Sequence, residues 1–507
     1  MPAELTYPGV YIEELPSGVR PIIGVSTSIT AFVGRARKGP VDDPVLIHNF
    51  ADYDRNFGGL WNESRMSFAV RQYFQNGGRD AVVVRVTRGV ATEAEASTFT
   101  FPGPGGDLEL EASSPGAWGD NLQVTLDTVG VPEPGLFNLT VVDPPPNGTN
   151  ESETLRNLSL DSAAASFVTD VLEQRSRFIR VAEGSTVPAS VPTNPAGPVS
   201  GTGGEDGGDV RAEDVMPASG RKGVRALDTV DVFNLLCLPP LSETEDVPAS
   251  TFNDAAAYLR ETTRRAMLLA DTPSSVVDVA DAIAFKETLD ADENAALFFP
   301  RLRAPNPLKG NLGEEFVASG AVAGVFARTD AERGVWKAPA GTEATVVGTS
   351  GLALTLTDAE SGQLNPVGIN ALRTFPLIGR VIWGSRTLRG ADSLADQWKY
   401  IPIRRLALFI EETLFRGTQW VVFEPNDEPL WAQIRLNIGA FMNGLFRQGA
   451  FQGTTPAQAY FVKCDSETTT QADIDRGVVN IVVGFAPLKP AEFVVLKIQQ
   501  MAGQVAA

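Results

Sequence analysis

AMLLADTPSSVVDVADAIAFKETLDADENAALFF, residues 266–299, contains two short apolar runs separated by a longer segment of mixed polarity. The apolar runs, residues 266–270 and 295–299, are typical of strands that are buried on both faces of a sheet. Residues 275–289 between them are predicted to form a helix. A strand, a helix and a second strand at this spacing predict neighbouring parallel strands joined by a crossover helix.

The same alternation continues on both sides of this stretch. Its further members are strands at residues 28–33, 81–86 and 232–238 and helices at residues 65–75, 253–264 and 314–327. Ala69, Val70 and Tyr73 share one face of the helix at 65–75, as helical periodicity requires. The simplest topology is one α/β domain with a largely parallel sheet, built from residues 21–90 and 225–370, and the chain between these segments is inserted into it.

The inserted chain has a different character. Residues 91–185 contain short β-prone runs, such as 122–126 and 136–142, between clusters of proline and glycine, which predicts a small all-β domain. Residues 186–224 include PTNPAGPVSGTGGEDGGD. Because this composition buries little apolar surface, the segment is predicted to be a flexible acidic loop.

Residues 371–490 are predicted to form a further, α+β domain. A helix at 403–416 precedes one at 427–448, whose apolar residues recur at intervals of three and four. Two strands follow, at 478–485 and 492–498.

Both ends of the chain are predicted to be extended arms, at residues 1–20 and 491–507. The β-prone run from Val10 through Tyr11 and Ile12 to Glu13 is cut off by Pro8-Gly9 and Pro16. Such a strand cannot bury itself and has to dock elsewhere, for instance on another subunit. The second candidate for such a contact is the apolar run Phe493, Val494, Val495 and Leu496.

Composition excludes several classes of protein. The net charge of −20 disfavours nucleic-acid binding, which depends on neutralising phosphates with Lys and Arg. We find no apolar run of transmembrane length and no secretory signal at Met1–Val10. We therefore expect that the chain assembles in the cytoplasm and does not insert into a membrane.

Charge is unevenly distributed along the chain. Residues 91–220 hold 5 Lys/Arg and 20 Asp/Glu, whereas residues 371–507 hold 14 and 12. This predicts an outward-facing middle segment and a C-terminal region that meets partners. The alternative is that the uneven charge reflects ordinary variation in composition between domains and has no functional meaning.

Candidate catalytic residues are few. The only histidine, His48, follows an alternating apolar run, and Cys237 lies in the apolar segment VFNLLCLP. Asp271 follows a predicted strand, where α/β enzymes place ligands, but a turn or helix-cap role fits it as well. We find no phosphate loop, metal pattern or nucleophile motif, so we predict no catalytic site, no metal and no cofactor. Without a catalytic site, we expect a structural protein that binds further copies of itself. The alternatives are a hydrolase that uses His48 and a passive scaffold such as a surface-layer or capsid protein.

Several ordered motifs resemble the tail sheath family of contractile phages and related injection systems. They are PGVYIEE (8–14), STSITAFVG (26–34), NGGRDAVVVRV (76–86), SPGAWGDNLQV (114–124), GAVAGVFARTDAERGVWKAPAG (320–341), LNPVGINALRTFP (364–376), WGSRTL (383–388), WKYIPIRRLALFIEET (398–413), FEPNDEPLW (423–431) and GFAPLKPAEFVV (484–495).

The resemblance implies a fold and a mechanism. The fold is a subtilisin-like α/β domain with an inserted β-sandwich, followed by a C-terminal sheath domain. The function is that of a structural subunit that polymerises helically around an inner tube in a metastable extended state and contracts to drive the tube through a target envelope. The implied partners are further copies of the chain, the tube protein, and baseplate and terminator or cap proteins. With the C-terminal domain as the layer next to the tube, Arg435 and Arg447 are possible inner-layer contacts. Phage tail, tailocin and extracellular injection system all remain open.

Overall fold

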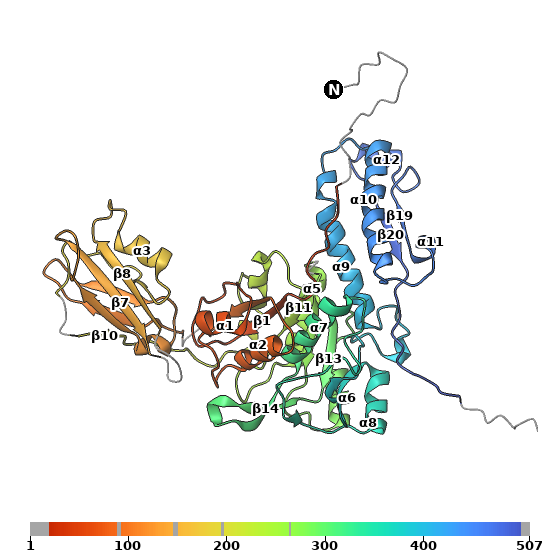
Figure 1. Ribbon diagram of the computed structural model, residues 1–507, viewed down its shortest axis with the longest axis horizontal. Coiled ribbons are helices and arrows are strands. Elements are labelled where there is room, and N and C mark those ends of the chain that lie inside the picture. The colour runs from red at the N-terminus through yellow and green to blue at the C-terminus, as the bar shows by residue number, and fades with distance from the viewer. Residues whose placement is uncertain (1–19, 89–92, 145–150, 194–196, 263–264, 498–507) are drawn as a thin grey trace, which may run out of the picture. The chain divides into compact units, whose positions relative to one another are not determined.

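The computed structural model describes residues 20–88, 93–144, 151–193, 197–262 and 265–497. The chain divides into two compact units (Figure 1). One unit, called here the sheet unit, comprises residues 26–332 and 339–399. The other, called here the helical unit, comprises residues 1–25, 333–338 and 400–507. Each unit combines helices and strands, so the predicted mixed α/β, multidomain class is confirmed.

The sheet unit is built around one eight-stranded sheet. Its order is β18-β17-β13-β12-β11-β1-β3-β2, and the neighbours from β17 to β3 run parallel. The strands are β1 (Thr30–Gly34), β2 (Val45–Ile47), β3 (Ala81–Arg85), β11 (Leu235–Cys237), β12 (Met267–Asp271), β13 (Ala295–Phe299), β17 (Ile369–Phe375) and β18 (Gly379–Ile382). Five central strands are buried at every position, which explains their continuous apolar sequences.

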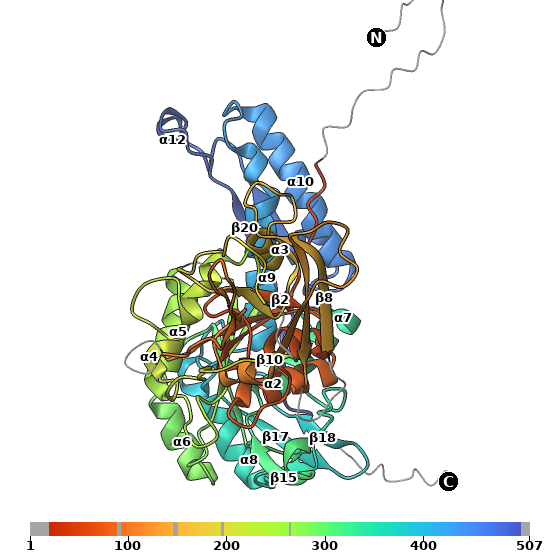
Figure 2. The ribbon, with the colours of Figure 1, turned by 90° about the vertical axis from the view of Figure 1, so that its left-hand side faces the viewer.

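Helices cover both faces of this sheet (Figure 2). Helices α5 (Ala249–Glu261), α6 (Val279–Glu287) and α8 (Asp358–Leu364) share one apolar core with alternate strand residues. Side chains of the opposite face meet α2 (Arg65–Gln75) and α7 (Ser319–Arg333), as in the ring contacts Phe32–Tyr73 and Phe298–Phe326. A further helix, α1 (Phe50–Phe57), precedes α2.

One predicted helix is wrong at its start. Residues 314–327 were predicted as a single helix, but β15 (Leu312–Phe316) pairs with β14 (Leu302–Asn306), and α7 begins only at Ser319. The reason is tertiary: hairpin pairing decides the conformation of residues 312–316, whose sequence LGEEF also suits a helix. The two-residue strand β16 (Gly351–Leu352) completes this small sheet.

The inserted chain forms two further sheets around a shared apolar core. Their orders are β10-β6-β7-β8 and β4-β5-β9. The elements are β4 (Thr98–Phe101), β5 (Leu108–Ala112), β6 (Gln123–Asp127), β7 (Leu136–Asp143), β8 (Glu151–Ser159), α3 (Val168–Arg175), β9 (Ile179–Val181) and β10 (Val199–Ser200).

Part of residues 186–224, predicted as a flexible acidic loop, is tied to the rest of the fold. Strand β10 pairs with β6 through Val199 and Val124, and the helix α4 (Ala212–Val215) follows. Val210 and Val215 are each only 1% exposed. Composition did not reveal this because the pairing partner lies far away in the sequence.

The helical unit is organised around two long helices that lie side by side (Figure 1 and Figure 2). These are α9 (Ile401–Gly417) and α10 (Glu428–Arg447), which confirms two predicted helices to within two residues. They share an apolar core with the antiparallel strands β19 (Tyr460–Lys463) and β20 (Val482–Phe485). Short helices α11 (Pro456–Ala459) and α12 (Gln471–Asp475) complete the unit.

Candidate assembly interface

The strands β19 and β20 form a sheet of two strands. Among the described residues, each has the other as its only partner strand. Tyr460 and Val462 face the core of the helical unit together with their register partners Phe485 and Val483. The opposite face of this sheet is exposed to water, and there the side chain of Phe461, which lies over Gly484, is 50% exposed. The outer edges of both strands therefore offer main-chain groups to further strands.

The segment after β20 shows the complementary property. Residues 488–497 lie in no helix or strand, so the predicted strand at 492–498 is not formed within this chain over its described residues. Phe493, Val494, Val495 and Leu496 are 75%, 80%, 77% and 82% exposed. Four adjacent apolar side chains in water are unfavourable for an isolated molecule, and exposed apolar patches commonly mark interaction sites. The other predicted contacts, Val10, Tyr11, Ile12 and Glu13, lie outside the described residues.

The two predicted inner-layer arginines differ in their surroundings. The guanidinium of Arg435 donates hydrogen bonds to the carbonyl oxygen of Cys464 and to the Glu428 carboxylate. The bond to Glu428 raises the pKa of Arg435. Arg435 is thus engaged within its own unit, whereas Arg447 is exposed at the last turn of α10.

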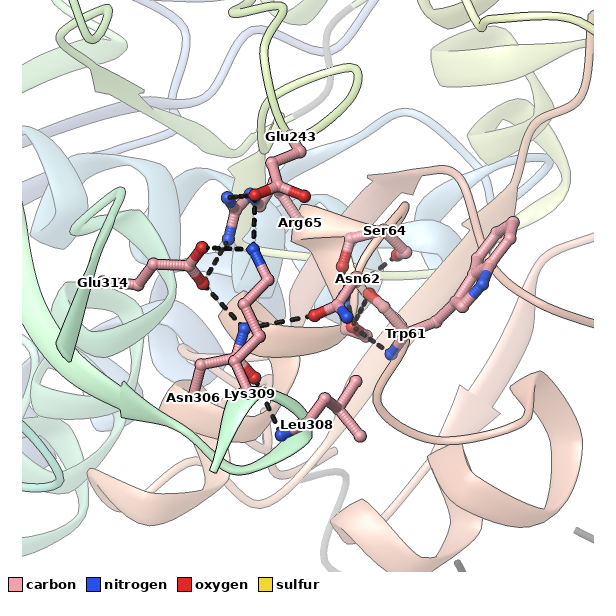
Figure 3. Close-up of polar contacts among 10 residues, drawn as sticks. Trp61, Asn62, Ser64, Arg65, Glu243, Asn306, Leu308, Lys309 and Glu314 are labelled. Atoms are coloured by element: carbon pink, nitrogen blue, oxygen red, sulfur yellow. Dashed lines mark hydrogen bonds and ion pairs between the residues drawn. The ribbon is translucent and has the colours of Figure 1, made fainter. Parts of the chain in front are cut away.

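A compact charge cluster joins the β14–β15 hairpin to α2 (Figure 3). Lys309 Nζ lies 2.5 Å from Glu243 Oε1 and 2.7 Å from Glu314 Oε1, and Arg65 Nη1 lies 3.3 Å from Glu314 Oε2. Asn306 Nδ2 also donates to Glu314 Oε2, at 2.7 Å.

The charges of this cluster are mutually neutralised. Partial burial opposes ionisation of Glu314, but hydrogen bonds from Lys309, Asn306 and Arg65 outweigh it and lower the pKa to about 2. The bonds to Glu243 and Glu314 raise the pKa of Lys309. Two carboxylates matched to two cations suit a structural lock on the hairpin better than acid–base chemistry. Sequence analysis missed this cluster because its members come from three distant segments.

Asp271 at the carboxyl end of β12 acts as a helix cap. Its Oδ1 accepts hydrogen bonds from the backbone N–H of Ala318 (3.0 Å) and of Ser319 (2.9 Å), at the start of α7. The cap interpretation is therefore confirmed, although the capped helix lies well along the chain. Burial raises the pKa of Asp271 to about 6, against these hydrogen bonds and the nearby Arg301, which favour the ionised form.

The residues that a hydrolase would need do not converge. Cys237 ends β11, next to β12 in the parallel sheet, and burial raises the pKa of its thiol well above the ordinary value. His48 lies at the other end of the parallel strands, directly after β2. Its Nδ1 is 2.7 Å from Oδ1 of Asp80. Asp80 precedes β3 and so marks the amino ends of the parallel strands. The histidine and the thiol therefore cannot act together.

In the described ranges, no group of three or more His, Cys, Asp or Glu side chains is arranged to hold a metal ion. No described helix is both long enough and apolar enough to cross a membrane.

Comparison with known proteins gives consistent results. The sequence model of the phage tail sheath protein central domain matches residues 218–388, and that of the phage tail sheath C-terminal domain matches residues 394–501. The chain is 27% identical over 179 residues to the tail sheath protein of Vibrio phage KVP40, a match that covers 35% of this chain and 25% of that protein. A putative prophage major tail sheath protein of Pseudomonas aeruginosa is 25% identical over 284 residues, or 55% and 69% of the two chains.

A solved structure resembles the whole chain. It is described as the PVC sheath complex of an extracellular contractile injection system in the contracted state. Its TM-score is 0.60 at 23% identity, and the match covers 98% of each chain. At this identity the similarity establishes a common fold.

Proposed function

The chain belongs to the phage tail sheath family, and on that basis we propose that it is the structural subunit of a contractile sheath. The match of both sheath domain models, in order along the chain, is the observation that carries this proposal. In this role the chain polymerises helically around an inner tube and contracts to drive the tube through a target envelope. The work comes from two packings of the same subunits rather than from bond hydrolysis, so no catalytic site is needed.

The proposed partners follow from the role. They are further copies of the chain, the inner tube protein, and baseplate and terminator or cap proteins. Assembly takes place in the cytoplasm, and the product is a phage tail or a phage-tail-like particle. The eight-stranded sheet with its helices would correspond to a subtilisin-like domain, and the two-sheet insertion to a β-sandwich.

Donated strands would hold the polymer together while the units rearrange. Residues 8–14 and 492–498 of neighbouring copies would add to the open edges of the β19–β20 sheet. Each main-chain hydrogen bond formed in this way contributes about 0.5–1.5 kcal/mol. Because main-chain bonds do not depend on side-chain packing, the link would persist while the remaining contacts between subunits change.

The charge distribution favours one orientation of the subunit. The acidic insertion would face outward, and the near-neutral helical unit would form the inner layer toward the tube. Exposed Arg447 is the better candidate for a tube contact than Arg435, whose guanidinium already has two acceptors within the unit. Charge reversal at Arg447 would then weaken tube binding.

Two truncations test the proposal. Deletion of residues 1–14, and truncation after Lys489, are each expected to leave a folded monomer by circular dichroism that forms no sheaths in negative-stain electron microscopy. Truncation after Gln500 is the matched control, since it removes only residues 501–507, which follow the donor, and should leave assembly intact. Normal tubes from both longer truncations would refute the donated-strand model.

A further inference from the structure

Residues 20–25, called here the strap, lie along helices α9 and α10 of the helical unit. The backbone N–H of Arg20 donates to Asn437 Oδ1 on α10, at 3.2 Å, and that of Val25 donates to Thr413 Oγ1 on α9, at 3.3 Å. The Arg20 guanidinium lies 4.5 Å from the ring centroid of Trp420. Both ends of the strap are thus fixed to the helix pair.

Two glycines make room for the middle of the strap. A Cβ atom on Gly417, the last residue of α9, would lie 2.7 Å from Ile22 Cγ2, and one on Gly24 would lie 2.9 Å from Cζ of Phe409. Ile22 packs against the core of the helical unit. Ile23, the next residue, is 83% exposed. Alternate residues therefore face inward and outward, and the inward face fits the helices closely.

We propose that the strap is the fixed root of the N-terminal arm and anchors it to the helical unit. This inference rests on the proposed role of residues 8–14 as a strand donated to a neighbouring copy. A donated strand links two subunits only if its own root holds, because a pull on the strand passes along the chain to the first fixed residues. With the strap docked, the load reaches α9 and α10, in the unit that also contains β19 and β20.

The strap also sets the length of the tether. If its six residues were released, they would add about 20 Å of free chain, at roughly 3.3–3.6 Å per residue. The effective concentration of a tethered strand falls roughly as the −3/2 power of tether length, or about threefold for each doubling. Releasing the strap would therefore raise the protein concentration needed for assembly even though the donor sequence is unchanged.

Adjacent isoleucines provide a matched test in the full-length chain. Ile22→Ala removes the inward side chain, and Ile23→Ala removes the same side chain from the exposed position. Gly417→Val is a second variant, which crowds Ile22 without shortening any side chain. Hydrogen exchange of the strap amides measures release in the monomer, and the critical concentration for sheath formation measures its consequence.

We expect Ile22→Ala and Gly417→Val to increase exchange at residues 20–25, to leave α9 and α10 protected, and to raise the critical concentration at least about threefold. Ile23→Ala should change neither quantity. A released strap with an unchanged critical concentration would overturn the inference. Impaired assembly in Ile23→Ala alone would also overturn it, in favour of a direct contact with a neighbour. Sheath formation by the chain lacking residues 1–14 would instead refute the donated arm itself.

Discussion

Docking of residues 493–496 as a strand would make alternate side chains unequal, because successive residues of a strand point to opposite faces. Phe493 and Val495 would then face one side of the extended sheet, and Val494 and Leu496 the other. One face of the β19–β20 sheet packs on an apolar core and the other is open. The paired substitutions Phe493→Ser with Val495→Ser, and Val494→Ser with Leu496→Ser, should therefore differ strongly in effect.

The size of the difference can be worked out from exposure. All four side chains are between 75% and 82% exposed in the free chain. Since burial of a Val, Leu or Phe side chain contributes about 1.5–3 kcal/mol, the inward pair should contribute roughly 2–5 kcal/mol to each joint. At about 1.4 kcal/mol per tenfold change in affinity, losing that pair raises the critical concentration between about thirtyfold and a few thousandfold. The outward pair should cost about 0.5 kcal/mol, as surface substitutions usually do.

Sedimentation of polymer from monomer over a series of protein concentrations measures both critical concentrations, and circular dichroism controls for folding. Equal losses from the two pairs would refute strand docking in favour of a segment that binds without a fixed face. No loss from either pair would show that this segment does not link subunits.

Two further predictions concern stability. Because the pKa of Asp271 is about 6 in the folded chain against an ordinary 3.8, folding favours the protonated carboxyl, and this stability is lost as the pH rises through that range. Asp271→Asn keeps the cap oxygen, so its stability relative to the natural chain should rise by up to roughly 3 kcal/mol between pH 4 and pH 7, measured by thermal melts. A stability difference that does not vary with pH would contradict this. Asp271→Ala should lose the cap and about 1 kcal/mol of stability. Glu314→Gln should destabilise the chain by about 1–3 kcal/mol at neutral pH because it leaves Lys309 and Arg65 less well paired. The pKa of Glu314 is lowered to about 2, so the two chains should converge as the pH falls below about 4.5, and a constant gap would argue against the charge cluster as the cause.

The parts of the fold that could be predicted from sequence are those fixed by local pattern. Strand β13, Ala295–Phe299, was predicted at its observed bounds because every residue is apolar and buried. Helix α2 was predicted equally well, since its apolar residues recur at helical spacing. In both cases the segment itself carries the whole signal.

The parts that could not be predicted depend on partners far away in the chain. Residues 312–316 form a strand because β14 pairs with them, and α7 starts where Asp271, some fifty residues earlier, supplies the cap. Strand β10 is similarly determined by β6. Sequence analysis singled out residues 493–496 as a candidate contact, and they are exposed, but it gave no sign that the strap would pack on α9 and α10.

The candidate interface can be recognised in a single chain because the proposed donor and the proposed acceptor sheet each lack a pairing partner among the described residues. An isolated strand has no partner strand for its main-chain hydrogen bonds, and an edge strand is paired along one side only, so both leave N–H and C=O groups that a further strand can pair. The helical unit contains both: four exposed apolar residues after β20, and two strands that pair only with each other among the described residues. Within the described residues, the side chains of 493–496 and of Phe461 are left largely exposed to water. Pairing between identical copies would satisfy both at once, and where the donor of each copy binds the acceptor of the next, this head-to-tail pairing continues into a polymer.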